Sequence, residues 1–394
     1  MVRLTLFDTQ GRVVSYKGEP LPDDYRRLMR FWHRGRSPQS TAEELMHDLV
    51  ENKREFQTEV ADALHPETRQ VVKMYQHGKP VYDRKGRLLG FEVLSVLHQP
   101  AGEEAGEAEE FKQYRRNHLW NTASSHLAEL ETHHLYSATH SVMVGVYGLA
   151  FGEVLDELIK NGSAPRELPK EYRQRNGFSQ EELYELLIAG YLHDIGKKFV
   201  PAETMDKKGG LAEEEWKAVQ GHLQLAIRPM LPLLSTAFAK RFIEQHHPYF
   251  IDPKKGDWRW EGRLAATVDV FHALSSKRSY REGQETGAEG AYKEMLASAN
   301  KPASDSRRLD PELVEIFGKH FNEINERAMT HLREEIARRE QELKKERANL
   351  DNAKKEGQSE GSISQISKAI EISEKANEAL AKELAERTGW SNVR

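Results

Sequence analysis

The chain has 394 residues, which is enough for two or three domains that each bury a core. Its formal net charge is -5, from 58 Lys and Arg against 63 Asp and Glu, and this balance gives no support for nucleic-acid binding. The absence of cysteine excludes disulfides and thiolate metal sites, so any metal site must use His, Asp and Glu. Neither a secretory signal nor a membrane-spanning apolar run is found, and we expect a cytoplasmic protein.

Residues 1–99 predict a small α+β module of a regulatory or sensor type. LTLFDTQGRVVSY and PVYDRKGRLLGFEVLSVL both place apolar residues around an Asp-x-x-Gly turn, a pattern that is typical of β-hairpins. Two such hairpins can form one antiparallel sheet. Helices are expected between them, near residues 22–33 and 41–63. The acidic stretch PAGEEAGEAEE, at 100–110, indicates a linker.

Residues 111–330 predict an all-helical domain, so the fold class is mainly α. The strand signal nearly vanishes in this part of the chain. Apolar residues recur instead at helical spacing, as in Val142, Val146, Leu149 and Leu155.

Residues 331–394 predict a C-terminal helical hairpin or coiled-coil arm. The segment is highly charged, and its sparse apolar residues include three that lie seven apart: Ile336, Leu343 and Leu350. Gly357 and Gly361 are expected to break the helix. The arm either joins two chains in a homodimer, which we favour, or packs on its own domain.

The stretch YLHDIGKKFVP, at 191–201, places His193 and Asp194 directly after an apolar run. Imidazole and carboxylate groups are costly to bury unless they are paired. The helical domain carries five further groups of these types in apolar surroundings: His140, His222, His246, His247 and Asp269. A single buried histidine is usually a core residue that one hydrogen bond satisfies. Together, however, these groups form a ligand set for Mn, Fe, Zn, Ni or Mg, in which a carboxylate can bridge two metals.

The adjacent pair His246-His247 points to more than one metal. Consecutive residues of a helix project in different directions, so the two rings could serve two ions, and the pair suits a pocket that holds more than one metal.

The order and context of these residues resemble the HD superfamily of metal-dependent phosphohydrolases, and closely its HD-GYP branch. The similarity covers about residues 131–320. It is carried by YSATHSVMVGVYG, LLIAGYLHDIGKKFVPAETMDKKGGLAEEEWKAVQGH, FIEQHH, ATVDVFHALSSKRSYR and LDPELVEIFGKHF.

This resemblance implies roles for individual residues. It assigns four ligands of the basic HD site, with Asp194 bridging two metals: His140, His193, Asp194 and Asp269. It assigns three further ligands of a binuclear or larger site: His222, His246 and His247. Lys197 resembles the lysine that contacts the substrate phosphate, and Asp194 and Lys197 are the expected catalytic residues. Arg278 and Arg281 are candidate phosphate contacts, with a structural salt bridge as the equal alternative.

The implied function is a metal-dependent phosphodiesterase or phosphohydrolase that acts on a nucleotide. Cyclic dinucleotides such as cyclic di-GMP are included, and the reaction would use water activated by two divalent cations. Fe or Mn is favoured, with Mg, Ni and Zn as alternatives. The competing hypothesis is a catalytically weak or inactive HD-GYP-like signalling or scaffold protein that binds a nucleotide or a protein partner. A di-iron oxygenase, the activity of some HD proteins, is disfavoured because Lys197 is retained.

Two departures from the HD-GYP pattern affect this interpretation. The Gly-Tyr-Pro tripeptide, associated with cyclic di-GMP recognition, is absent from HHPYFIDPKKGDWRWEGRL, which puts the substrate more in doubt than the metal site. Tyr249, Trp258 and Trp260 either stack on a base or form a lid on the core. Tyr136 stands where some members place a glutamate for a third metal, so we expect a binuclear site.

Overall fold

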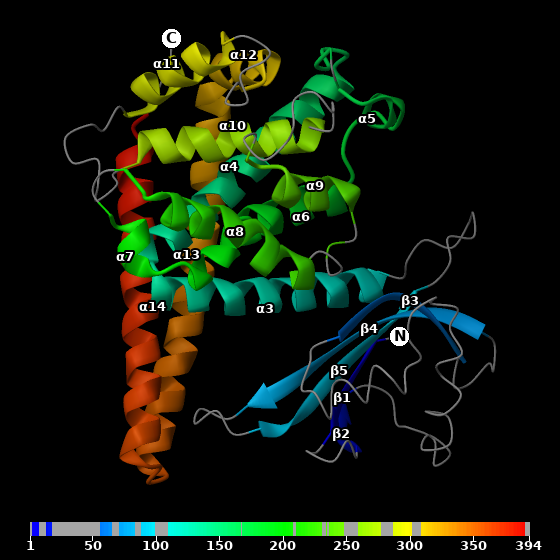
Figure 1. Ribbon diagram of the computed structural model, residues 1–394, viewed down its shortest axis with the longest axis vertical. Coiled ribbons are helices and arrows are strands. Elements are labelled where there is room, and N and C mark those ends of the chain that lie inside the picture. The colour runs from blue at the N-terminus through cyan, green and yellow to red at the C-terminus, as the bar shows by residue number, and fades with distance from the viewer. Residues whose placement is uncertain are drawn as a thin grey trace. The chain divides into compact units, whose positions relative to one another are not determined.

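In the computed structural model the chain forms two compact units, Met1–His118 and Leu119–Arg394 (Figure 1). The described residues are 2–7, 13–17, 56–64, 71–82, 88–98 and 109–390, except for 167, 208–209, 231–233, 235, 248–258, 277–286 and 302–308. The second unit includes residues 119–330 of the predicted helical domain and the whole of the predicted arm. The finer domain boundaries at residues 99, 110 and 330 stay predictions.

The first unit contains a five-stranded antiparallel sheet. Its strands are β1 (Val2–Phe7), β2 (Val13–Lys17), β3 (Phe56–Leu64), β4 (Val71–Tyr82) and β5 (Leu88–His98), in the order β2-β1-β5-β4-β3. Both predicted hairpins, β1–β2 and β4–β5, are present. Pairing of β1 with β5, from Val2 opposite Val96 to Phe7 opposite Phe91, joins them into one sheet as expected.

The helix predicted over 41–63 is wrong at its end, because residues 56–63 belong to β3. The segment FQTEVADAL alternates Phe56, Thr58 and Val60, which suits a strand. Its antiparallel ladder with β4 supplies the partner that a local sequence pattern does not reveal. Residues 41–55 and the helix predicted at 22–33 lie outside the described residues.

The second unit is helical throughout its described residues, so the predicted mainly α fold is confirmed. Helix α3 (Glu109–His133) begins in the first unit and continues into the second. It is followed by α4 (Leu135–Lys160), α5 (Lys170–Gln174), α6 (Gln180–Leu192), the 3-10 helix η1 (Ile195–Phe199) and α7 (Ala202–Met205). There follow α8 (Glu213–Met230), α9 (Ala237–Glu244), α10 (Trp260–Ser275), α11 (Gly287–Ala299), α12 (Pro311–Lys319), α13 (Phe321–Lys355) and α14 (Glu360–Arg387). None of the helices in the described ranges is long and apolar enough to cross a membrane.

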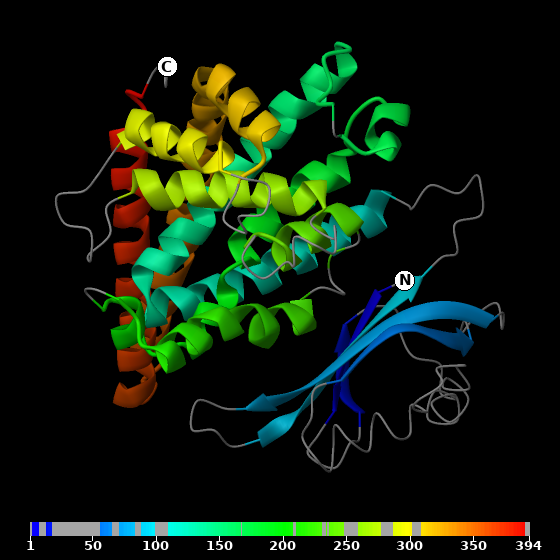
Figure 2. The ribbon, with the colours of Figure 1, turned by 45° about the horizontal axis from the view of Figure 1, so that its top comes forward.

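Helix α4 lies at the centre of this unit and packs against α6, α10 and α13. Figures 1 and 2 show α10 crossing it. Where α4 meets α6, a Cβ atom on Gly190 would lie 2.3 Å from the Cα atom of Gly145. Only glycine permits this close approach of two helix backbones. The crossing brings His140 of α4 near His193 at the end of α6.

The predicted C-terminal arm is a helical hairpin of α13 and α14 (Figure 1). Gly357, with φ of +69°, lies in the turn between them as expected. Gly361 does not break the helix, since α14 begins at Glu360. The base of the hairpin packs on α4 of its own domain and buries Leu332 and Leu380. Homodimerisation through the arm stays a prediction.

Candidate metal centre

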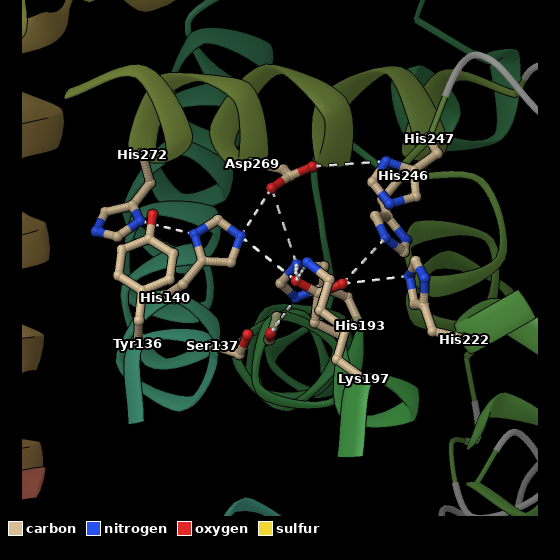
Figure 3. Close-up of polar contacts among 12 residues, drawn as sticks. Tyr136, Ser137, His140, His193, Lys197, His222, His246, His247, Asp269 and His272 are labelled. Atoms are coloured by element: carbon tan, nitrogen blue, oxygen red, sulfur yellow. Dashed lines mark hydrogen bonds and ion pairs between the residues drawn. The ribbon is translucent and has the colours of Figure 1, made fainter. Parts of the chain in front are cut away.

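Seven side chains chosen from the sequence meet between the helices of the second unit. Figure 3 shows their rings and carboxylates converging from five elements. His140 lies on α4, His193 and Asp194 follow α6, His222 lies on α8, His246 and His247 follow α9, and Asp269 lies on α10. Except for the partly buried His247, all of these residues are buried.

The HDIGK motif forms a sharp change of helix type. Helix α6 begins at a capping box between Ser179 and Glu182 and ends at Leu192. The chain then turns through His193 and Asp194 into η1, so α6 does not continue through the motif. The i+3 spacing of a 3-10 helix aligns Lys197 with Asp194. The Lys197 ammonium accordingly pairs with Asp194 Oδ2.

The two oxygens of Asp194 face two different groups of histidines. Oδ2 lies 3.3 Å from His193 Nε2 and 3.6 Å from His140 Nε2. Oδ1 lies 3.2 Å from His222 Nε2 and 3.9 Å from His246 Nε2. The donor atoms form two sets, each within 4.8 Å, that share Asp194: one with His140 and His193, the other with His222, His246 and His247. A carboxylate in this position is able to bridge two cations.

Asp269 lies across the same two groups. Its Oδ1 is 2.9 Å from His140 Nε2 and 3.9 Å from His193 Nε2. Its Oδ2 is 3.9 Å from His247 Nδ1. The carboxylate of α10 thus faces the histidines from the side opposite η1 (Figure 3).

Three histidines are held so that Nε2 points into the centre. Their Nδ1 atoms contact the backbone carbonyls three residues earlier: His193 that of Gly190, His222 that of Val219, and His246 that of Ile243. A carbonyl only accepts, so each Nδ1 carries the proton and donates it. The buried Nε2 atoms of these three rings, and Asp194 Oδ1, have no hydrogen-bond partner. Buried acceptors without a donor fit a divalent cation, and such second contacts are typical of metal-binding histidines.

The electrostatics place Asp194, His246 and His247 in the forms that bind cations. Burial opposes the charge of Asp194, but Lys197 and His193 outweigh it and hold the pKa of this carboxyl well below its usual value. Burial lowers the pKa of His246 well below its ordinary value and that of His247 to about 3. Near neutral pH these rings are neutral and the carboxylate is ionised, as metal binding requires.

The expectation that His246 and His247 serve two ions does not fit the structure. Both lie in the same donor set, and their ring centroids are 4.0 Å apart. Helix α9 ends at Glu244, so the pair lies beyond the helix, and helical geometry does not separate the rings.

Of the aromatic residues considered from the sequence, Trp260 lies in the core and Tyr136 lies beside the metal centre. Trp260 is buried at the start of α10 against Tyr172 and Phe238, so it belongs to the core and does not stack on a ligand. Tyr136 stacks on His140 (Figure 3), and its hydroxyl lies 3.2 Å from Ser276 Oγ. Tyr249, Trp258, Arg278 and Arg281 lie outside the described residues.

Sequence reasoning missed a second layer of buried polar groups. His272, one turn after Asp269, contacts His140. Glu383 and Arg387 of α14 form an ion pair next to it, in which Arg387 is buried and Glu383 partly buried. Because His272 follows Asp269 by three residues on a predicted helix, the two side chains were expected on the same face, and this spacing could have placed His272 near the centre. Nothing in the charged sequence of α14 marks Glu383 or Arg387.

Comparison with known proteins identifies the class of domain. Residues 152–313 match a family described as the HD domain. This stretch includes six of the seven clustered residues, and His140 lies just before it. The chain therefore carries a domain of the HD superfamily, and the HD-GYP-like resemblance seen in the sequence is confirmed.

The three relatives described next are all named as phosphodiesterases of cyclic dinucleotides. The chain is 29% identical over 158 residues to a 3'3'-cGAMP-specific phosphodiesterase 2 of Vibrio cholerae. The aligned stretch covers 38% of this chain and 28% of that protein. The chain is 28% identical over 160 residues to a cyclic di-GMP phosphodiesterase of Thermotoga maritima, covering 38% and 41%. A cyclic di-GMP phosphodiesterase response regulator of Xanthomonas campestris is 30% identical over 129 residues, covering 29% and 33%. The chain thus spans less than half the length of these relatives.

Proposed function

We propose that the chain is a metal-dependent phosphodiesterase that hydrolyses a cyclic dinucleotide. The observation that carries this proposal is the position of Asp194, whose two oxygens face two separate sets of histidines. The names of the related proteins, which are cyclic di-GMP or 3'3'-cGAMP phosphodiesterases, support the same class of substrate.

The proposed centre holds two divalent cations with Asp194 between them. One set of ligands is His140, His193 and Asp269, and the other is His222, His246 and His247. When bound, two such cations lower the pKa of a water molecule, polarise phosphoryl oxygens and neutralise the leaving oxygen. Imidazole and carboxylate ligands suit Mn and Fe, which we favour, and also Zn or Ni. Tyr136, whose hydroxyl contacts Ser276 Oγ, stands where a ligand of a third metal would be, so we expect two cations and not three.

Lys197 is proposed to contact a phosphate oxygen of the substrate. Its side chain is 21% exposed beside the almost fully buried Asp194, so the ammonium lies at the edge of the centre. Three ammonium protons allow Lys197 to pair with Asp194 and also to donate to a phosphate. An ammonium has no lone pair, so Lys197 acts on the substrate without binding a cation. Contacts from Arg278 and Arg281 stay part of the proposal on sequence grounds alone.

The choice among cyclic dinucleotides rests on the segment after His247. It lacks Gly-Tyr-Pro, and Trp260 within it is part of the core. We therefore expect turnover of cyclic di-GMP to be weak, or another phosphoester to be preferred. Efficient, selective hydrolysis of cyclic di-GMP would contradict this part of the proposal.

The proposal is tested with purified protein reconstituted anaerobically with Mn²⁺ or Fe²⁺. The substrate panel contains cyclic di-GMP, 3'3'-cGAMP, linear dinucleotides, mononucleotides and a generic phosphodiester. We expect cyclic dinucleotides to be hydrolysed and the Asp194→Asn variant to be inactive. Nucleotide binding without turnover of any compound would favour the alternative, an inactive signalling or scaffold protein.

We further propose that the distal half of the α13–α14 hairpin joins two chains in the cytoplasm. The base of the hairpin packs on α4 of its own domain, so it is not open to a second chain. In the distal half, Leu350, Ile363 and Ile366 are only partly buried. Pairing with the same surface of a second chain would bury these apolar side chains.

A further inference from the structure

A row of polar side chains, all buried except for the partly buried Glu383, leads from the candidate metal centre to the last helix. His140 Nδ1 lies 2.8 Å from Nδ1 of His272, on the side of the ring away from Asp194 (Figure 3). His272 Nε2 lies 3.7 Å from Oε2 of Glu383 on α14. Glu383 pairs with Arg387, whose guanidinium also donates to Ser275 Oγ at 3.1 Å. His272 and Arg387 are 0% and 1% exposed, so water does not replace these contacts.

The contact between the two imidazoles permits two arrangements of protons. A neutral imidazole carries a proton on one ring nitrogen, and the two Nδ1 atoms lie at hydrogen-bond distance, so one of them donates and the other accepts. In the first arrangement His140 Nδ1 donates to His272 Nδ1, and the lone pair of His140 Nε2 faces the centre. In the second, His272 donates, and His140 Nε2 carries a proton directed at Asp269 Oδ1, 2.9 Å away. Only the first leaves His140 able to bind a cation.

Glu383 distinguishes the two arrangements. In the first, the remaining proton of His272 is on Nε2 and faces the Glu383 carboxylate. In the second, the buried Nε2 lone pair faces that partly buried carboxylate, and two acceptors oppose each other. Such a pair is unfavourable in a site of low dielectric. At 3.7 Å the contact is longer than a hydrogen bond and acts as a charge–dipole interaction.

We propose that Glu383, acting through His272, is a positioning residue that holds His140 in the tautomer whose Nε2 binds a cation. The inference rests on the proposed metal site. It makes α14 a functional part of the centre although this helix supplies no ligand. Partners of this kind typically change metal affinity by about 10- to 100-fold.

The first test compares two substitutions of His272 in the full chain. In His272→Asn, the amide oxygen takes the place of Nδ1 and still accepts from His140. In His272→Leu, no acceptor remains. Titration calorimetry with Mn²⁺ should give near wild-type affinity for the first variant and a loss of about 10-fold or more for the second. Equal affinities of the two variants would overturn the inference.

The second test removes the ion pair without leaving a buried charge alone. Replacing both members, as Glu383→Met with Arg387→Met, is expected to keep the fold. Mn²⁺ affinity should fall about 10-fold, and adding His272→Asn should restore it, because the amide accepts without help from Glu383. Glu378→Gln, an exposed position of the same helix, is the matched control and should bind Mn²⁺ as the wild type does.

The outcomes separate this inference from the proposed function. Unchanged Mn²⁺ affinity of the doubly substituted variant at an unchanged melting temperature overturns the role of Glu383 and leaves the metal site standing. A wild-type protein that binds no Mn²⁺ overturns both. If the double substitution prevents folding, the two His272 variants decide the inference, since they leave the Glu383–Arg387 pair in place.

Discussion

Gly196 of the HDIGK motif lies against the backbone of α8, and adding one methyl group there tests the geometry of the centre. A Cβ atom on Gly196 would lie 1.9 Å from the carbonyl oxygen of His222 and 2.9 Å from its Cα atom. Real Cβ contacts essentially never fall under 3.0 Å, so the backbones of η1 and α8 would have to move apart here by at least the difference between 1.9 and 3.0 Å. The obstacle is backbone, which a change of rotamer does not relieve.

This displacement should act on one half of the centre. His222 contributes to the set around Asp194 Oδ1, whereas His140 and His193 face Oδ2 and do not depend on α8. Gly196→Ala should therefore reduce the content of bound metal from two ions per chain towards one. Overpacking of this kind costs typically about 1–3 kcal/mol of the free energy of unfolding.

The assay is elemental analysis after reconstitution with Mn²⁺ and removal of free metal. The matched control is Gly221→Ala, next to His222 on α8, where a Cβ atom meets nothing within 4 Å. The control should keep both ions and gain up to about 1 kcal/mol of helix stability. Two tightly held ions in Gly196→Ala, or an equal loss of metal in Gly221→Ala, would refute the reasoning.

Three further predictions concern the remaining residues of the HDIGK motif, an ion pair of α13 and the C-terminal arm. Asp194→Ala should lose both the bound metal and hydrolysis. Lys197→Ala should keep the metal, and its turnover should fall by a factor of about 10²–10³, by analogy with oxyanion-hole donors. Unchanged turnover of Lys197→Ala together with a lower melting temperature would show that Lys197 only stabilises the fold. Burial opposes the charge of His331, but Glu153, 3.1 Å away, outweighs it and raises the pKa of His331 above 6.5. The stabilisation of the fold by charged His331 is therefore complete below pH 6.5 and is lost as the pH rises through the folded-state pKa. In denaturant titrations, the difference in free energy of unfolding between the wild type and His331→Gln should shrink over that range. A difference that does not change with pH would contradict this prediction. Replacing residues 348–373 with a short linker should convert a dimer to a monomer in light scattering without loss of metal, and an unchanged mass would exclude pairing through that part of the arm.

The fold could be predicted wherever the pattern is local. Helical periodicity and the turn at Gly357 identified the helical domain and the hairpin of the arm. The strand β3 was missed because its stability comes from pairing with β4, and Trp260 was left open because burial depends on Tyr172 and Phe238, which are distant in sequence.

The candidate site could be predicted because ligands must be particular residue types in a recognisable order. Their second contacts have no such constraint. His193, His222 and His246 are oriented by backbone carbonyls, which any residue provides. His272 and Glu383 lie on different helices, and only the packing of α14 beside α10 brings them together.

The most direct test of the account is whether hydrolysis of a cyclic dinucleotide depends on bound metal. One preparation is assayed as purified, after a chelator has removed the metal, and after Mn²⁺ or Fe²⁺ has been restored. We predict that turnover disappears with the metal and returns with it, and that Asp194→Asn stays inactive throughout. Full turnover by the metal-free protein, or none by the reloaded protein, would contradict the account.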